Sequence, residues 1–205
     1  MRLPAAPPLE QALDFLWAAA SVGLAVETIQ TMPAHRTAGV LLFLAIHTLT
    51  AILFLVRRPA RAVPPGTASR AIAVASMLTV YLFDLDCAGD GPAAALGVWF
   101  VQIGTLLCLA ATLNLGRNFA VMPSYRGLST RGLYGIVRHP LYAAYLLVDL
   151  GFLAQAPSVA NGTVFVASLG LLLARIAVEE ELLAHQPSYE GYRAVTKYRL
   201  VPLVW

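Results

Sequence analysis

Residues 93–114 read AAALGVWFVQIGTLLCLAATLN and contain no charged side chain. A helix of about 20 apolar residues crosses the roughly 30 Å hydrocarbon core of a bilayer, so this run is long enough to span a membrane. Further apolar runs lie at 10–30, 37–56, 70–88, 140–156 and 161–179. The sequence therefore predicts an all-α, polytopic membrane protein with about six transmembrane helices.

The composition supports this class and argues against others. Hydrophobic residues make up 59% of the 205 residues and charged residues 12%, whereas a soluble domain averages about 45–50% and about 25%. The net charge of +3 forms no dense basic patch of the kind that binds nucleic acid. The two cysteines form no CxxC motif or Cys/His cluster, so we expect neither a metal site nor a disulfide framework.

We expect a single membrane domain over residues 1–205, in which residues 1–90 supply N-terminal helices and residues 91–205 form a C-terminal core. The basic residues predict its orientation, because cytoplasmic loops are enriched in Lys and Arg. If the arginine-rich connection after 37–56 lies inside, all but one of the 14 Lys and Arg residues are cytoplasmic. The sequence thus predicts a multi-pass protein of the cell (inner) membrane with both termini in the cytoplasm.

Clustered polar residues follow position 113, whereas the first three apolar runs carry few. They occupy 132–142 (GLYGIVRHPLY), 175–181 (RIAVEEE) and a tyrosine-bearing tail after position 188. The predicted topology brings these three segments to one membrane boundary, which favours a site between helix ends. Purely structural interpretations also stay open. The glycines could serve turns, Arg175 and Glu179 could form an ion pair four residues apart on a helix, and the tyrosines could anchor the chain at the membrane interface.

The order of these motifs resembles the isoprenylcysteine carboxyl methyltransferase (ICMT) superfamily, which includes membrane phospholipid methyltransferases. The motifs that carry the resemblance are Leu115-Gly116-Arg117-Asn118-Phe119, Gly132-x-Tyr134, Arg138-His139-Pro140-x-Tyr142, Glu179-Glu180 and Tyr189-x-x-Tyr192. They cover roughly residues 113–202. The chain departs from the family in its tail, where His185-Gln186-Pro187-Ser188 replaces the usual Phe-Gly turn, and this departure leaves the acceptor open.

The resemblance implies an enzyme that takes S-adenosyl-L-methionine from the cytosol, releases S-adenosyl-L-homocysteine, and receives a lipophilic acceptor through the bilayer. It places His139, Pro140, Glu179 and Glu180 in the cofactor site. The carboxylate, ammonium and adenine of the cofactor also need donors, acceptors and ring faces. The other cofactor-binding residues that we predict are Tyr134, Val137, Arg138, Tyr142 and Tyr189.

Methyl transfer from a sulfonium requires in-line approach at about 3 to 3.5 Å and neither a metal nor a covalent intermediate. A carboxylate acceptor is already ionised at neutral pH, and we expect Arg175 and Asn118 to hold it. An amine or thiol acceptor would need a base, for which Glu179 or His139 could serve. The predicted activity is carboxyl O-methylation, with Arg175, Glu179 and Asn118 as catalytic residues. The alternative is a non-catalytic assembly factor or small transporter with a degenerate cofactor site. The oligomeric state is left open.

Overall fold

The computed structural model describes residues 15–24, 26, 37–86 and 88–204. About half of the predicted span 10–30 lies outside these residues, and the described part contains the helix Phe15–Leu24. The remaining helices are α2 (Thr37–Val56), α3 (Ala68–Leu78), α4 (Pro92–Leu115), α5 (Pro140–Gln155), α6 (Val159–Ala184) and α7 (Tyr189–Val195). Short 3₁₀ helices form η2 (Thr79–Leu82), η3 (Gly116–Asn118) and η4 (Gly132–Gly135). Within the described residues no strand forms, and the all-helical fold is confirmed.

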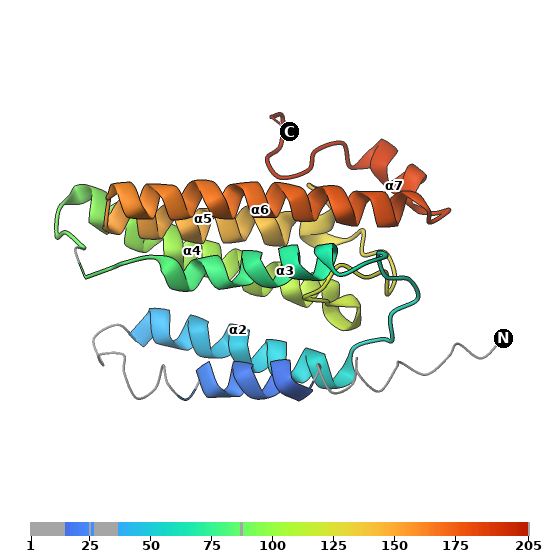
Figure 1. Ribbon diagram of the computed structural model, residues 1–205, viewed down its shortest axis with the longest axis horizontal. Helices are drawn as coiled ribbons and strands as arrows, with labels where there is room; N and C mark the ends of the chain where they lie inside the picture. Colours follow the sequence, from blue (N-terminus) through green and yellow to red (C-terminus); the bar gives the residue numbers. More distant parts are fainter. Residues whose placement is uncertain (1–14, 25, 27–36, 87, 205) are drawn as a thin grey trace.

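The long helices lie side by side in one bundle (Figure 1). α5 packs against both α4 and α6, while α3 contacts α6 and α2 contacts α4. The helix Phe15–Leu24 joins the bundle through Trp17, whose ring stacks on Phe54 of α2 with centroids 6.4 Å apart. α7 lies at one end of the bundle, beside the end of α6, and the chain after α7 turns back over α6 (Figure 1).

Small residues let α4 and α5 approach closely. A Cβ atom at Gly97 would lie 2.5 Å from the Gly151 carbonyl oxygen, and one at Gly151 would lie 2.7 Å from that of Gly97. Gly104 faces Val148 in the same way, 2.7 Å from a side-chain methyl. Close backbone approach at small residues is a common basis of helix association in membranes, and it brings the ends of α4 and α5 together.

Among the described residues, three helices are long and apolar enough to cross a membrane: Gly39–Val56, Pro92–Asn118 and Val159–Ala184. The others, Phe15–Leu24, Ala68–Leu82 and Pro140–Gln155, are shorter. The predicted run 70–88 stops being helical at Leu82, because Phe83 is extended. Asn161 of α6 then accepts from the Asp84 N–H at 2.9 Å and donates to the Asp84 carbonyl at 2.7 Å. The structure thus confirms an apolar helical bundle, and the count of six spans stays a prediction.

The connections between the helices gather at two opposite ends of the bundle. At one end the Arg58 N–H donates to the Arg117 carbonyl at 2.8 Å, and the Arg61 N–H donates to the Tyr125 carbonyl at 2.7 Å. At the other end the Gly89 N–H donates to the Gln155 carbonyl at 3.0 Å. The arginine-bearing loops therefore share one end, which also carries the tail and the candidate site.

Candidate active site

The segment before α5 is held in place by the C-terminal tail. The Arg138 and His139 N–H groups donate to the carbonyls of Tyr198 and Arg199 at 2.9 and 2.8 Å. Pro140 then begins α5 at its first position, where a missing N–H costs nothing. Because the tail fixes the backbone on both sides of the Arg138 Cα and up to the His139 N–H, the directions of the Arg138 and His139 side chains follow from the fold.

A tight turn orients Tyr134 ahead of this segment. Gly132 has φ +62°, and a Cβ there would collide with the side chain of Asn114, so a glycine fits where other residues would be strained. Asn114 at the end of α4 accepts the Leu133 N–H at 2.8 Å. The Tyr134 carbonyl in turn accepts the Tyr192 hydroxyl of α7 at 2.7 Å. η4 is thereby fixed to both α4 and α7, and the Tyr134 ring is buried.

Glu180 of α6 collects three basic side chains. Its Oε1 accepts from Arg138 Nε at 2.8 Å and lies 3.3 Å from His139 Nε2, and its Oε2 accepts from Arg199 Nε at 2.9 Å. Arg138 also donates to the carbonyls of Thr196 and Lys197. The hydrogen bond to Glu180 raises the pKa of Arg199. Glu180 thus joins α6 to the start of α5 and to the tail.

Glu179, one residue earlier, faces a different set of groups. It accepts a short hydrogen bond from the Tyr142 hydroxyl. Its carboxylate also lies 3.7 Å from Arg175 Nε and 3.8 Å from His139 Nδ1. The His139 ring stacks on Tyr142, with centroids 5.6 Å apart and planes 5° from parallel. His139 therefore lies between the two glutamates, with one ring nitrogen toward each.

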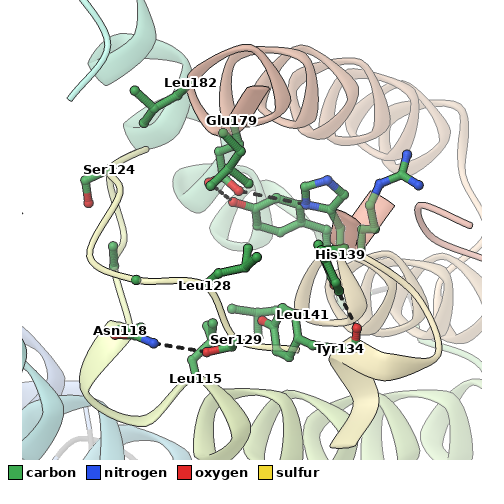
Figure 2. A pocket seen from close by; sticks show the side chains of 16 residues that line it. Leu115, Asn118, Ser124, Leu128, Ser129, Tyr134, His139, Leu141, Glu179 and Leu182 are labelled. Atoms are coloured by element: carbon green, nitrogen blue, oxygen red, sulfur yellow. Dashed lines mark hydrogen bonds and ion pairs between the residues drawn. The ribbon is translucent and has the colours of Figure 1, made fainter. Parts of the chain in front are cut away.

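These side chains border a cavity of about 110 Å³ (Figure 2). Six of the predicted residues line it: Asn118, Tyr134, Arg138, His139, Tyr142 and Glu179. The other lining residues were not predicted to belong to the site: the polar Ser124, Ser129 and Tyr192, of which Tyr192 was noted only in the tail motif, and an apolar wall formed by Leu115, Leu128, Leu141, Leu182 and Leu183. Only Leu128 lies in the irregular segment 119–131; Leu115 ends α4, Leu141 lies in the first turn of α5, and Leu182 and Leu183 lie near the end of α6.

Asn118 lies on the side of the cavity away from Glu179 (Figure 2). Its amide nitrogen donates to the Ser129 hydroxyl at 3.2 Å, and its oxygen accepts from Arg58 at 3.3 Å. Gly127, with φ +143°, passes close to this amide. The loop 119–131 is thereby held against η3, and the two polar side chains occupy one wall.

Five predicted residues do not line the cavity. Glu180, Val137 and Pro140 lie behind its wall, where they hold the start of α5 in place. Tyr189 is buried, and burial raises the pKa of its hydroxyl to about 12. Arg175 is 3% exposed. Its guanidinium lies 4.8 Å from the Tyr142 ring centroid and donates to the Val121 carbonyl, so it supports the wall from behind.

Burial also raises the pKa of Tyr134 and of Tyr192 above the usual value for a tyrosine. Both hydroxyls are therefore neutral at physiological pH. A neutral phenol can donate a hydrogen bond and presents an apolar ring face. The cavity thus combines one carboxylate, two basic side chains, neutral hydroxyls and an apolar wall.

Residues 95–185 match the isoprenylcysteine carboxyl methyltransferase (ICMT) family. The resemblance to this family is confirmed. The matched segment contains all the cavity-lining residues except Tyr192. Searching the curated proteins gives no match to this sequence.

The fold is also similar to a solved structure of a eukaryotic intramembrane Ras methyltransferase, ICMT. The two share 18% sequence identity with a TM-score of 0.50, over 92% of this chain and 74% of the other. At this identity the likeness concerns the fold. The protein is thus an ICMT-like membrane protein, with its polar cavity at one end of an apolar helical bundle.

Proposed function

We propose that the protein is an S-adenosyl-L-methionine-dependent methyltransferase that acts on a lipophilic acceptor reached from the membrane. One observation carries the proposal: within the ICMT-like segment, a single cavity brings Glu179, His139 and Arg138 together with the rings of Tyr134 and Tyr142. These residues come from two segments that are distant in the chain, 132–142 and 175–181, and meet only in the folded protein.

The donor set fits the cofactor chemically. When bound, the cofactor supplies an electrophilic methyl group on a sulfonium. Arg138 and His139 offer donors to its carboxylate, and Glu179 can accept from its ammonium or ribose hydroxyls. Tyr134 and Tyr142 present ring faces, which suit a flat base and a cation. Methyl transfer in this site does not require these residues to bind a metal.

The size of the cavity bears on how the cofactor would enter it. Its volume of about 110 Å³ is below the roughly 300–1,000 Å³ of most small-molecule sites. The wall formed by Ser124, Gly127, Leu128 and Ser129 belongs to an irregular loop, whereas the opposite wall is built on α5 and α6. We infer that the loop moves outward when the cofactor enters, and that α5 and α6 stay in place.

Each polar residue has a separate part in this scheme. Glu179 and His139 contact the ligand, and Asn118 on the far wall contacts the acceptor. Glu180 holds Arg138 and His139 in position. Arg175, which the sequence predicted to hold the acceptor carboxylate, is buried behind Tyr142, so we assign it the positioning of Glu179 and Tyr142. A carboxylate acceptor, such as an isoprenylcysteine-type acid, is already ionised and needs no base in this scheme.

We further propose that the cavity opens on the cytoplasmic side of the cell membrane, with both termini on that side. The support is the arginine-bearing loops, which lie at the same end of the bundle as the cavity. Cysteine labelling from outside intact cells tests this placement, in a variant whose two native cysteines are replaced by serine. The cysteine of Thr67→Cys would be protected and that of Asp90→Cys labelled, and the reverse pattern would invert the topology.

Transfer of a radiolabelled methyl group tests the activity. Purified protein would be incubated with labelled cofactor and either a prenylcysteine analogue or a membrane lipid extract. A labelled lipophilic product that loses its label in mild base identifies a carboxyl methyl ester, and a base-stable product identifies an amine or thiol acceptor. Protein that binds cofactor but labels neither substrate set would favour the non-catalytic alternative.

A further inference from the structure

A second cavity, of about 290 Å³, lies beside the first and has a different lining. It is bordered by the helix Phe15–Leu24, the end of α2, the start of α3 and the loop segments 60–64 and 121–126. Ser124 lines both cavities. The proposed methyl transfer does not use this second space.

Four arginines line it: Arg57, Arg61, Arg70 and Arg126. Among the described residues that form its wall, none is acidic. Arg126 is 4% exposed, although burial of an arginine is costly unless polar groups surround it. Arg61 and Arg70 are exposed at its edge, and a guanidinium can bind a phosphate through two parallel hydrogen bonds, so this basic lining favours an anion.

The buried hydroxyl of Ser69 points to the same kind of ligand. Ser69 lies in the first turn of α3 and is 6% exposed. Within the part of the chain that the structure describes, its hydroxyl has no hydrogen-bond partner. Buried polar groups without partners are uncommon in folded proteins. A bound anion would supply the missing acceptor.

The opposite wall is aromatic. Trp17 stacks on Phe54, and the guanidinium of Arg57 lies 4.9 Å from the Phe54 ring centroid. Arg57 directly follows the candidate span Gly39–Val56, so a bilayer that surrounded this span would place its phosphates near these arginines. An apolar wall joined to a basic rim at this depth suits an acyl chain below a headgroup.

The loops that form the rim are tied together. The Arg126 side chain donates to the Arg58 carbonyl. Ala62 and Tyr125 form an antiparallel bridge. The two loops at the edge of the cavity are therefore joined to each other, which distinguishes the site from a chance gathering of surface charges.

We propose that this second cavity binds the phosphate of an anionic membrane lipid, with the acyl chain along Trp17 and Phe54. The site is separate from the cofactor cavity, and lipid binds there without cofactor. Because a basic residue near a membrane surface contributes about fivefold to the affinity for anionic lipid, loss of two arginines weakens binding more than tenfold.

Binding of acyl-labelled phosphatidylglycerol to the full-length protein in detergent tests the proposal, with the phosphatidylcholine of the same chains as the neutral lipid. We expect phosphatidylglycerol to bind at least fivefold more tightly. The double variant Arg61→Gln/Arg70→Gln should lose more than tenfold in this affinity. The matched variant Arg193→Gln/Lys197→Gln, which removes the same charge from the tail, should retain it.

A single substitution provides a second test that is less sensitive to effects on folding. Ser69→Ala removes a hydroxyl that has no internal partner among the described residues, so it should weaken phosphatidylglycerol binding about three- to tenfold with an unchanged melting temperature. Thr67→Ala, at the exposed start of the same helix, should change neither. Equal binding of the two lipids, or wild-type affinity in the arginine double variant, would overturn the proposal. Displacement of the lipid by glycerol 3-phosphate at equal potency would also overturn it, because the ligand would then be a soluble phosphate ester.

Discussion

Replacing Glu180 by glutamine keeps the size of the side chain and removes the charge that Arg138, His139 and Arg199 share. The carboxylate accepts from the two arginines at 2.8 and 2.9 Å and lies 3.3 Å from the His139 ring. The substituted glutamine would keep one carbonyl acceptor and turn its amide donors toward basic groups. The start of α5 and the tail would then lose their common anchor.

The size of the effect follows from the burial of the partners. A hydrogen bond to a charged group contributes about 1.5–3 kcal/mol, and breaking a buried ion pair costs about 3–5 kcal/mol. The Arg138 side chain is 5% exposed and that of Glu180 12%, so solvent screens the pair weakly. Arg138 keeps its carbonyl acceptors at Thr196 and Lys197, which reduces the loss. We expect a local destabilisation of about 2–3 kcal/mol.

Two measurements follow the change. Hydrogen exchange at the Arg138 and His139 amides, which donate to the tail, should accelerate by more than tenfold. The affinity for S-adenosyl-L-homocysteine should fall at least tenfold, about 1.4 kcal/mol. Glu181→Gln, at the exposed neighbouring position, is the control and should change neither. Wild-type exchange and affinity in Glu180→Gln would refute the role assigned to this carboxylate.

Three further predictions concern the site, the helix interface and the tail. His139→Ala should weaken S-adenosyl-L-homocysteine binding about tenfold by calorimetry, and unchanged affinity would place the ligand elsewhere. Gly151→Ala should lower stability by about 1–3 kcal/mol, because the added methyl meets the backbone of α4. At Gly162 an added methyl would meet no atom within 4 Å, so Gly162→Ala should instead raise the stability measured by thermal unfolding. Equal effects of the two substitutions would disprove the close approach of α4 and α5. Tyr189 has a pKa of about 12 in the folded protein and about 10 in the unfolded chain. Its contribution to the free energy of unfolding is therefore fully present below pH 10 and is lost as the pH rises toward 12. Tyr189→Phe should therefore remove the contribution of about one proton from the slope of the unfolding free energy against pH in this range. An unaltered slope would show that Tyr189 is not buried.

Much of the site could be predicted because its residues lie at the ends of regular helices. Arg138 and His139 precede α5, and Glu179 and Glu180 lie near the end of α6, so a topology that placed both ends together also placed these side chains together. The i,i+4 pairing of Arg175 and Glu179 needed only helix geometry. Local periodicity and charge were sufficient for this part.

Other contacts depend on the path of irregular chain, which local patterns do not encode. Ser129 reaches the cavity through the loop 119–131, and Tyr192 through the turn into α7. Arg175 was predicted to be at the surface of the site, but Tyr142 covers it, which only packing decides. Asp149 was also missed: it lies buried on α5 and accepts from Ser168 of α6. A single acidic residue inside an apolar run gives no indication of its partner.

Calorimetric titration of the full-length protein with S-adenosyl-L-homocysteine tests the central claim most directly. The cavity between α5, α6 and the tail predicts saturable binding at one site per chain, weakened in His139→Ala and retained in Glu181→Gln. Folded protein with a cooperative melting transition that gives no heat of binding at two different temperatures would contradict it.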